Sequence, residues 1–303
     1  MARQVIDTTT DHGSYKGDPA KVAFDKANAN FAELYALTSL AGDNLLINCG
    51  VPINQRGFAG GSLAAGAYGY DRWKAGSGGC NVTINAGTGV FTHTSGPLQQ
   101  VVEAPQLAWG QALTFSVESP SGSISVSVGG ATGTITAGSG RRGVTLTPSG
   151  SGHMTVQITA TGVTYSRPKL ERGSSATAFE VRPWAVEFAL CQRYFEKSYN
   201  GNMAPGTADR TGSYRCSILN GFFLTAGAVP FSVQKRGATA ITLYAARDGS
   251  VGNGSEVNNQ GVFIANRSLS ASAQGTSQFQ VGGVNTLTAG SIIEFHWTAD
   301  AEL

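Results

Sequence analysis

The chain has 303 residues, only 13% of them charged, and its 21 Lys and Arg side chains nearly balance its 19 Asp and Glu side chains. The formal net charge of +2 creates no long-range field that would attract polyanions, which argues against a nucleic-acid partner. No apolar run approaches the ~20 residues that a membrane-spanning helix requires, and the opening MARQVIDTTTDHG contains no apolar signal segment. We therefore expect no membrane insertion, and we expect two or three modules at about 100–200 residues per domain.

The first predicted element is an amphipathic helix within residues 1–42. Asp18 followed by Pro19 favours a helix start, because the carboxylate can accept hydrogen bonds from unpaired backbone amides and proline needs no donor there. Phe24, Phe31 and Leu34 then recur at helical spacing on one stripe. A short helix cannot bury such a stripe alone. The stripe either docks on another chain or packs against the module that follows.

Residues 43–182 change to a period of two, which is typical of antiparallel strands with one apolar face. Gly-rich turns separate the alternating runs, and a disordered Gly/Ser-rich segment would lack such runs. We predict a jelly-roll-like β-sandwich here. The runs are Leu113, Phe115 and Val117; Ile124, Val126 and Val128; Val144 and Leu146; Met154, Val156 and Ile158; and Val163 with Tyr165.

A second helix is predicted over residues 183–199, directly after the sandwich. Its apolar arc is so broad that a neighbouring sandwich would cover only one side. Packing around a three-fold axis would cover the rest, so we expect a linker helix that forms the neck of a homotrimer. The predicted neck residues are Trp184, Val186, Phe188, Leu190, Tyr194 and Phe195.

Residues 200–303 return to a period of two and predict a second, smaller β-sandwich. Segments 247–259 and 266–276 are rich in Gly, Ser and Asn, which favours exposed loops of the kind that carry binding sites. The predicted fold class is therefore mainly β, with two antiparallel β-sandwich domains, an N-terminal helix and a linker helix. Strands are expected over residues 217–224, 229–233, 241–245, 262–264, 279–281 and 293–297.

The four cysteines have no spacing typical of a metal site. Without a secretory signal they are expected in a reducing compartment, so we predict that Cys49, Cys80, Cys191 and Cys216 are free buried thiols. A Cys49–Cys80 disulfide is the alternative. The four histidines also lack metal-ligand spacing, so we expect neither a metal nor a cofactor.

Enzymatic chemistry has little support in the sequence. Glycan hydrolysis needs two carboxylates held about 5–10 Å apart, and the candidates are Glu103, Glu118, Asp248 and Glu256. Glu103 and Glu118 stand beside proline-containing turns, which fits solvated loop ends better than a shared cleft. No nucleophile elbow or phosphate-binding Gly-rich loop is present. We therefore predict that the chain is not an enzyme.

Sugar recognition would use aromatic rings against the apolar face of a pyranose, with amide and guanidinium groups on its hydroxyls. The candidates in the first sandwich are Tyr68, Tyr70, Trp73 and Trp109, the last of which lies between two strand patterns. Trp297 alternates with Phe295 and is expected in the core. Ordinary solvated loop residues are the alternative for each candidate. The predicted binding residues are Tyr214, Arg215, Asn220, Tyr244, Arg247, Asp248, Asn266, Arg267 and Trp109.

Several phrases resemble those of bacteriophage tail fibres and receptor-binding tail proteins. They are KLERGSSATAFEVRP (169–183), LCQRYFEKS (190–198), NLLINCGVPINQRG (44–57), DRW (71–73) and FHWTADAEL (295–303). GSYKGDPAKVAFDKANANFAELYA (13–36) is similar to the opening of fibre chains that dock on a virion. The predicted jelly-roll is similar to carbohydrate-binding modules. In this family Trp73 is implied to be a core residue, supported by an ion pair between Arg72 and Asp71.

The resemblance implies four parts: a virion-attachment segment (1–42), a carbohydrate-module-like jelly-roll (43–182), a trimerising helix (183–199) and a receptor-binding sandwich (200–303). Phe24, Phe31 and Leu34 would dock on tail or baseplate proteins. The expected function is non-enzymatic attachment of the virion to a host surface polysaccharide, lipopolysaccharide or pilus, by a chain made in the bacterial cytoplasm. Two alternatives stay open: a baseplate protein that does not touch the host, and a small capsule or lipopolysaccharide depolymerase.

Overall fold

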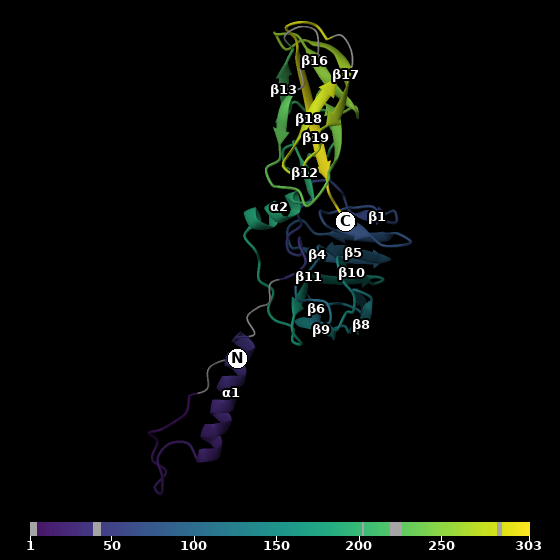
Figure 1. The fold of residues 1–303 in the computed structure, drawn as a ribbon. Helices are drawn as coiled ribbons and strands as arrows, with labels where there is room; N and C mark the ends of the chain where they lie inside the picture. The colour runs from purple at the N-terminus through teal and green to yellow at the C-terminus, as the bar shows by residue number, and fades with distance from the viewer. Residues whose placement is uncertain (1–4, 39–43, 202, 219–225, 284–286) are drawn as a thin grey trace.

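The computed structural model describes residues 5–38, 44–201, 203–218, 226–283 and 287–303. Within these ranges the chain is mainly β, with antiparallel sheets and two helices, which confirms the prediction of a mainly β, antiparallel fold (Figure 1). Buried apolar side chains form two clusters, one drawn from residues 46–170 and the other from residues 218–299. The β-structure around the first cluster is called the first sandwich below, and that around the second the C-terminal sheet.

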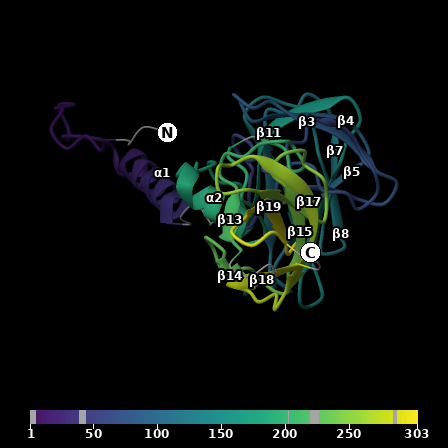
Figure 2. The same ribbon diagram turned by 90° about the horizontal axis from the view of Figure 1, so that it is seen from above.

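Helix α1 (Ala20–Thr38) lies apart from both β-structures in Figures 1 and 2. Phe24 and Phe31 are 69% and 56% exposed, so neither ring packs on the first sandwich. Leu34 lies on the same helix, but its side chain falls outside the part of the chain that the structure describes. The apolar stripe is therefore uncovered at Phe24 and Phe31, and what it docks on stays a prediction.

The start of α1 differs from the predicted cap. The Asp18 carboxylate accepts hydrogen bonds from the Asp7 backbone N–H (2.8 Å) and from Lys26 Nζ (2.6 Å), rather than from the first turn of the helix. The positive charge of Lys26 attracts the carboxylate more strongly than a neutral amide does. The bond from Asp7, and a further one from Lys26 Nζ to the Val5 carbonyl oxygen (3.1 Å), hold the segment before the helix back along it.

The first sandwich has two antiparallel sheets whose inner faces share the first apolar cluster. Val126, Val156 and Ile158 are buried and their polar neighbours are partly or fully exposed, so the predicted period of two is confirmed there. Around Phe115 the polar neighbours Thr114 and Ser116 are buried as well. In spatial order, one sheet contains β1 (Gly61–Leu63), β3 (Cys80–Ile84), β4 (Val90–Ser95), β11 (Val163–Arg172), β6 (Leu113–Glu118) and β9 (Arg141–Leu146). The other contains β2 (Lys74–Ala75), β5 (Pro97–Val102), β10 (Met154–Thr159), β7 (Ile124–Val128) and β8 (Ala131–Ile135).

The C-terminal sheet is organised around β19 (Ile292–Asp300), which pairs with four strands. β13 and β12 follow one another along one edge of β19, and β16 and β15 along the other, as the paired residues require. The remaining strands are β12 (Phe195–Lys197), β13 (Tyr214–Ser217), β14 (Ala226–Pro230), β15 (Ala240–Ala245), β16 (Asn253–Val257), β17 (Phe263–Ser272) and β18 (Gln278–Gly283).

The prediction that segments 247–259 and 266–276 are loops is wrong. β16 runs through the first segment, β17 through most of the second, and the two strands pair as a hairpin. β16 lacks the expected alternation because Gly254, Ser255 and Glu256 are all buried. A Cβ atom on Gly254 would come within 2.6 Å of Leu269, so this strand needs a residue without a side chain.

The predicted helix 183–199 is wrong at its C-terminal end, since α2 spans only Trp184–Gln192. The chain then turns, and Phe195 begins β12, which pairs with the end of β19. Tyr194 and Phe195 are 4% and 5% exposed, so neither lies on a helical neck face. Pairing with β19 satisfies the backbone groups that a longer helix would have satisfied, and it buries both rings.

Contacts of Arg72 favour the turn that follows α2. It forms an ion pair with Glu302, donates to the Val101 carbonyl oxygen (2.5 Å) and lies 3.4 Å above the Tyr194 ring. The expected ion pair between Arg72 and Asp71 is therefore wrong. Trp73, by contrast, is fully buried in the core as expected.

A second arginine spans the same joint between the two β-structures. Arg56 pairs with Asp300 (2.9 Å), and its guanidinium lies 3.8 Å from the centre of the Phe195 ring. Asp71 accepts hydrogen bonds from Gln55 Nε2 (2.6 Å) and its backbone N–H (3.0 Å), and Gln55 also donates to the Phe195 carbonyl oxygen (2.7 Å). The phrases 44–57, 71–73, 190–198 and 295–303 thus all contribute to this joint.

The four cysteines are free thiols, as predicted. Cys49, Cys80 and Cys191 are buried, whereas Cys216 on β13 is only half-buried, which corrects the prediction for that residue. Cys80 Sγ lies 3.7 Å from His93 Nε2, and burial raises the pKa of Cys80 to about 11. A thiol with so high a pKa is almost entirely protonated at neutral pH and is a poor nucleophile.

Candidate functional site

The best candidate site lies on the outer face of the C-terminal sheet. Alternation along β19 directs Ile293 and Phe295 into the apolar cluster and Glu294 and His296 to the opposite face. Glu294 is only 1% exposed, although it lies on the face away from that cluster. A buried carboxylate in the middle of a central strand requires nearby positive charge.

Two arginines from neighbouring segments supply that charge. Arg210 donates through Nε (2.8 Å) and Nη2 (2.6 Å) to the two oxygens of Glu294, and Arg215 Nη2 lies 2.8 Å from the same carboxylate. Burial alone would raise the pKa of Glu294, but the bond from Arg210 and the charges of Arg210, Arg215 and Arg247 outweigh it and lower that pKa. Glu294 is therefore ionised at neutral pH and holds both arginines in place.

Arg247 joins this face from the turn after β15. Its backbone N–H donates to Ser255 Oγ (3.1 Å), and Ser255 pairs with Glu294 across the sheet. Its Nη2 donates to the Gly261 carbonyl oxygen (2.5 Å), and its guanidinium lies 5.8 Å from the centre of the Phe263 ring. The ring is 42% exposed. An accessible aromatic ring beside a guanidinium is an arrangement suited to sugar binding.

Asn266 and Asp248 complete the polar part of this face. Asn266 Nδ2 donates to Asp248 Oδ2 (2.5 Å) and to Ser250 Oγ (3.1 Å), while its side-chain oxygen accepts from Ser255 Oγ (3.2 Å). The structure therefore brings four predicted binding residues together. These are Arg215, Arg247, Asp248 and Asn266.

Tyr244 is next to this group but is engaged in packing. Its ring lies edge-on to Tyr199 at 5.9 Å, and Tyr199 stacks on His296 at 3.9 Å. His296 Nδ1 lies 2.8 Å from Ser198 Oγ, and burial lowers the pKa of the imidazole. His296 is therefore neutral at pH 7 and supports the packing of Tyr244.

The other predicted binding residues lie elsewhere. Tyr214 faces the core, with its ring 5.4 Å from that of Phe295, and Arg267 donates to the buried Glu256 (2.6 Å). Trp109 is half-buried in a loop of the first sandwich, where its indole N–H donates to the Gly152 carbonyl oxygen (3.0 Å). Asn220 lies outside the described residues.

The neck residues divide into two groups. Trp184 and Val186 are 66% and 48% exposed, while Phe188 and Leu190 are half-buried on α2. The ring of Trp184 stacks on Phe188 at 4.7 Å. The exposed side of α2 is therefore available for contact with another chain, whereas Tyr194 and Phe195, which lie beyond the helix, are not.

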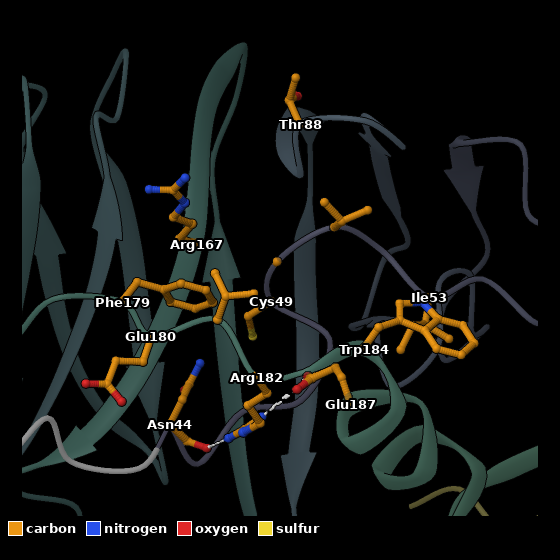
Figure 3. A pocket seen from close by; sticks show the side chains of 13 residues that line it. Asn44, Cys49, Ile53, Thr88, Arg167, Phe179, Glu180, Arg182, Trp184 and Glu187 are labelled. Carbon is orange, nitrogen blue, oxygen red and sulfur yellow. Dashed lines mark hydrogen bonds and ion pairs between the residues drawn. The ribbon is translucent and has the colours of Figure 1, made fainter.

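A cavity of about 250 Å³ adjoins Trp184, between residues 49–53, residues 179–182 and α2 (Figure 3). Two of its charged groups bind one another: Arg182 pairs with Glu187 (3.0 Å) and also donates to the Leu46 carbonyl oxygen (3.1 Å). The Cys49 thiol faces the cavity, and burial raises its pKa well above the usual range. The cavity offers apolar walls rather than reactive groups.

The four carboxylates considered for hydrolysis are each bound to separate partners. Glu103 pairs with Arg193 (3.0 Å), and Glu118 with Arg141 (3.3 Å). Asp248 and Glu256 are held by Asn266 and Arg267, as described above. Glu103 in fact joins the first sandwich to the segment after α2, so its position beside a turn gave no sign of its actual contact.

The sequence analysis did not single out Arg210, Phe263 or Glu294. Glu294 carried a usable signal, because a carboxylate between Ile293 and Phe295 in a strongly apolar strand predicts a cationic partner on the outer face. The apolar run 262–264 predicts a short strand and gives no reason to expect that Phe263 is exposed. Arg210 lies in a turn before β13 and has no local pattern that would identify it.

Two negative observations apply to the described residues alone. No helix there is long and apolar enough to cross a membrane. No group of three or more His, Cys, Asp or Glu side chains is placed to hold a metal ion in that part of the chain.

Comparisons with known proteins do not show a family. No family model matches the sequence, and no curated protein matches it. One similar structure is a Paenibacillus cycloisomaltooligosaccharide glucanotransferase in complex with cycloisomaltoheptaose, which is 10% identical with a TM-score of 0.22. The match covers 82% of this chain and 47% of that enzyme. YlbA of E. coli is 13% identical with a TM-score of 0.13, and the match covers 82% of this chain and 93% of YlbA. Procruciferin of Brassica napus is 11% identical with a TM-score of 0.13, and the match covers 84% of this chain and 85% of procruciferin. Likenesses this weak carry no argument about function.

Proposed function

We propose that the chain is a bacteriophage tail fibre or receptor-binding tail protein that attaches the virion to a glycan on the host surface without cleaving it. The observation that carries the proposal is the position of two unlike surfaces at opposite ends of the molecule (Figure 1). At one end α1 exposes Phe24 and Phe31, and at the other the C-terminal sheet presents Arg215, Arg247 and Phe263. One end suits anchoring to a protein assembly, and the other suits sugar.

The tail-protein phrases give the proposal its second support. Four of them meet at the joint between the first sandwich and the C-terminal sheet, where Arg56 and Arg72 are bound. A buried ionic joint holds the two β-structures in one orientation, as a fibre that transmits an attachment force requires. In this proposal the chain resides in the virion after synthesis in the bacterial cytoplasm.

Assembly into a homotrimer belongs to the same proposal. Trp184 on α2, Val51 (54% exposed) and Val181 (75%) line the cavity of Figure 3 with apolar side chains, and Val186 is exposed on the same helix. A second copy of the chain is the proposed occupant, because a fibre needs identical chains and α1 exposes a further apolar stripe of its own. Three weak glycan sites held together gain avidity of about 10²–10⁴ over one site.

Binding of the labelled full chain to susceptible bacteria tests the proposal. We expect saturable binding to cells on which the virion adsorbs and none to receptor-negative mutants of that strain, with no oligosaccharide released into the medium. A baseplate protein without host contact would bind neither kind of cell. A depolymerase would release oligosaccharide, and the release would fall on neutralising Glu103, Glu118, Asp248 or Glu256.

A further inference from the structure

The outer face of the C-terminal sheet narrows the chemistry of the receptor, on the condition that the proposed attachment function holds. Two arginines, Arg210 and Arg215, bind Glu294, which is itself 1% exposed, and Arg247 lies on the same face, where its backbone N–H binds Ser255 opposite Glu294. The side chains of Arg210 and Arg215 are 45% and 51% exposed. Their guanidinium groups are therefore fixed on one side by a buried carboxylate and open to solvent on the other.

Donor groups remain after these internal bonds are formed. Arg210 uses Nε and Nη2 on Glu294, and Arg215 uses Nη2, so the Nη1 groups of both have no acceptor among the described residues. Arg247 uses Nη2 on Gly261, and its Nε is buried, so the donors open to a ligand are those of Arg210 and Arg215. Guanidinium groups with free N–H pairs bind carboxylate and phosphate oxygens in preference to neutral hydroxyls.

Nearby acids do not remove this preference. Asp248 accepts from the Ser250 backbone N–H (2.9 Å) and from Asn266 Nδ2 (2.5 Å), and Asp209 accepts from the Thr211 backbone N–H (2.9 Å). Counting Glu294 and both aspartates, the acids balance the three arginines in formal charge. Selectivity for an anion would therefore rest on the direction of the free guanidinium donors rather than on net charge, and would persist at moderate salt.

An apolar contact for the sugar ring lies beside these donors. Phe263 is 42% exposed, and its neighbours Val262 and Ile264 are 59% and 40% exposed. The Arg247 guanidinium lies 5.8 Å from the centre of the Phe263 ring. Gly261 is close to Arg210, since a Cβ atom added to this glycine would lie 3.9 Å from Arg210 Nη2. The ring and at least two guanidinium groups thus border one surface.

From this arrangement we infer that the face binds an anionic sugar of the receptor glycan. Arg215 and Arg210 would bind its anionic group, and Phe263 would contact the apolar face of the ring. A sugar carboxylate and a sugar phosphate present the same oxygen chemistry to guanidinium, so either can supply the anion. A neutral glycan would leave the free donors without charged acceptors.

The test uses surface polysaccharide purified from a strain on which the virion adsorbs. The full chain is titrated with the native polysaccharide, with the same material after its carboxylates are reduced to alcohols, and with dephosphorylated material. We expect one treatment to abolish binding and so to identify the source of the anion. Arg215→Gln and Arg210→Gln should each weaken binding of the native material about 10- to 100-fold. Arg142→Gln, at an exposed arginine of the first sandwich, is the matched control and should bind as wild type does.

Each alternative result contradicts a distinct claim. Undiminished binding after both treatments would overturn the inference and leave the attachment function standing. Loss of binding on treatment, with both variants still binding as wild type does, would overturn the assignment to these arginines. No binding of any polysaccharide, by a chain that also fails to bind the cells, would overturn the attachment function itself. Matching thermal unfolding of variants and wild type excludes misfolding as the cause of a loss.

Discussion

Two acidic side chains buried at the joint between the two β-structures have raised pKa values. Asp71 is fully buried, and burial raises its pKa to about 6 in spite of Arg56 and the bonds from Gln55. Burial likewise raises the pKa of Glu302, against the attraction of Arg72 and Arg56. Two buried acids here share two arginines, so the joint is sensitive both to pH and to the loss of either cation.

The raised pKa of Asp71 predicts a specific dependence on pH. The folded state binds this proton more tightly than the unfolded state, so its contribution to stability is present near pH 4 and is lost as pH rises through about 6. Asp71→Asn removes that contribution. The free energy of unfolding of the variant relative to wild type should therefore rise by roughly 2–3 kcal/mol between pH 4 and pH 7. Urea denaturation across this range measures the difference, and a flat difference would contradict the account.

Arg72 gives the second prediction at this scale. Arg72→Met removes the partner of Glu302 in a buried setting, so we expect a loss of about 3–5 kcal/mol in the free energy of unfolding. Adding Glu302→Gln should recover much of the loss, because no unpaired buried charge then remains. Arg142→Met, at an exposed position, is the control and should change stability little. Equal losses in the single and double variants would show that the ion pair is not the cause.

At the scale of elements, the turn between β15 and β16 positions the site. Gly249 has φ +74°, and a Cβ atom there would overlap the Gly206 carbonyl oxygen at 1.8 Å. This contact holds the turn against the segment that leads to Arg210. Gly252 has nearly the same φ, +72°, but has open space around its missing side chain. Substituting each glycine by alanine therefore distinguishes the cost of backbone strain, present at both positions, from the cost of steric overlap, present only at Gly249.

The comparison of Gly249→Ala with Gly252→Ala tests that separation. Gly252→Ala should cost about 1 kcal/mol, since its cost is limited to the left-handed backbone conformation. Gly249→Ala should cost clearly more and should also weaken glycan binding, because the Arg210 segment must move. Chemical denaturation and polysaccharide binding of the full chain provide the two readings. Equal effects of the two substitutions would contradict the proposed contact.

The sequence predicts a strand correctly where one face of that strand carries polar residues. β7 and β10 alternate because their outer faces meet solvent, and β6 alternates in residue type although its polar Thr114 and Ser116 are buried, so all three could be predicted. β16 is covered on both faces by Leu269 and by the arginine cluster, so its Gly254-Ser255-Glu256 core resembles a loop in the sequence. The end of α2 could not be predicted either, because pairing of Phe195 with β19 is a contact across more than 100 residues.

The residues of the candidate site could be predicted only in part. Residue type alone predicts Arg215, Arg247, Asp248 and Asn266 at strand ends or in loops, although Arg215 lies in β13 and Asn266 in β17. Tyr214 was misplaced because its side chain faces the core, a fact set by its pairing with Phe295 rather than by local sequence. Arg210 and Phe263 come together only through the fold of the sheet.

At the scale of the whole molecule, the exposed side of α2 predicts self-association. A homotrimer should have three times the 31.3 kDa mass of the chain in light scattering. Trp184→Ser should lower that mass, because it removes a 66% exposed ring from the proposed contact. Leu107→Ser, at an 84% exposed apolar residue of the first sandwich, should leave it unchanged. A monomeric wild-type chain would contradict the trimer.

Adsorption competition tests the central claim, host attachment, most directly. Purified full-length chain is mixed with host bacteria before the phage is added, and the unadsorbed phage are counted. We predict that wild type and Arg142→Gln block adsorption, whereas Arg215→Gln blocks it much less. Full adsorption in the presence of a saturating amount of the folded wild-type chain would contradict the claim that this chain binds the host receptor.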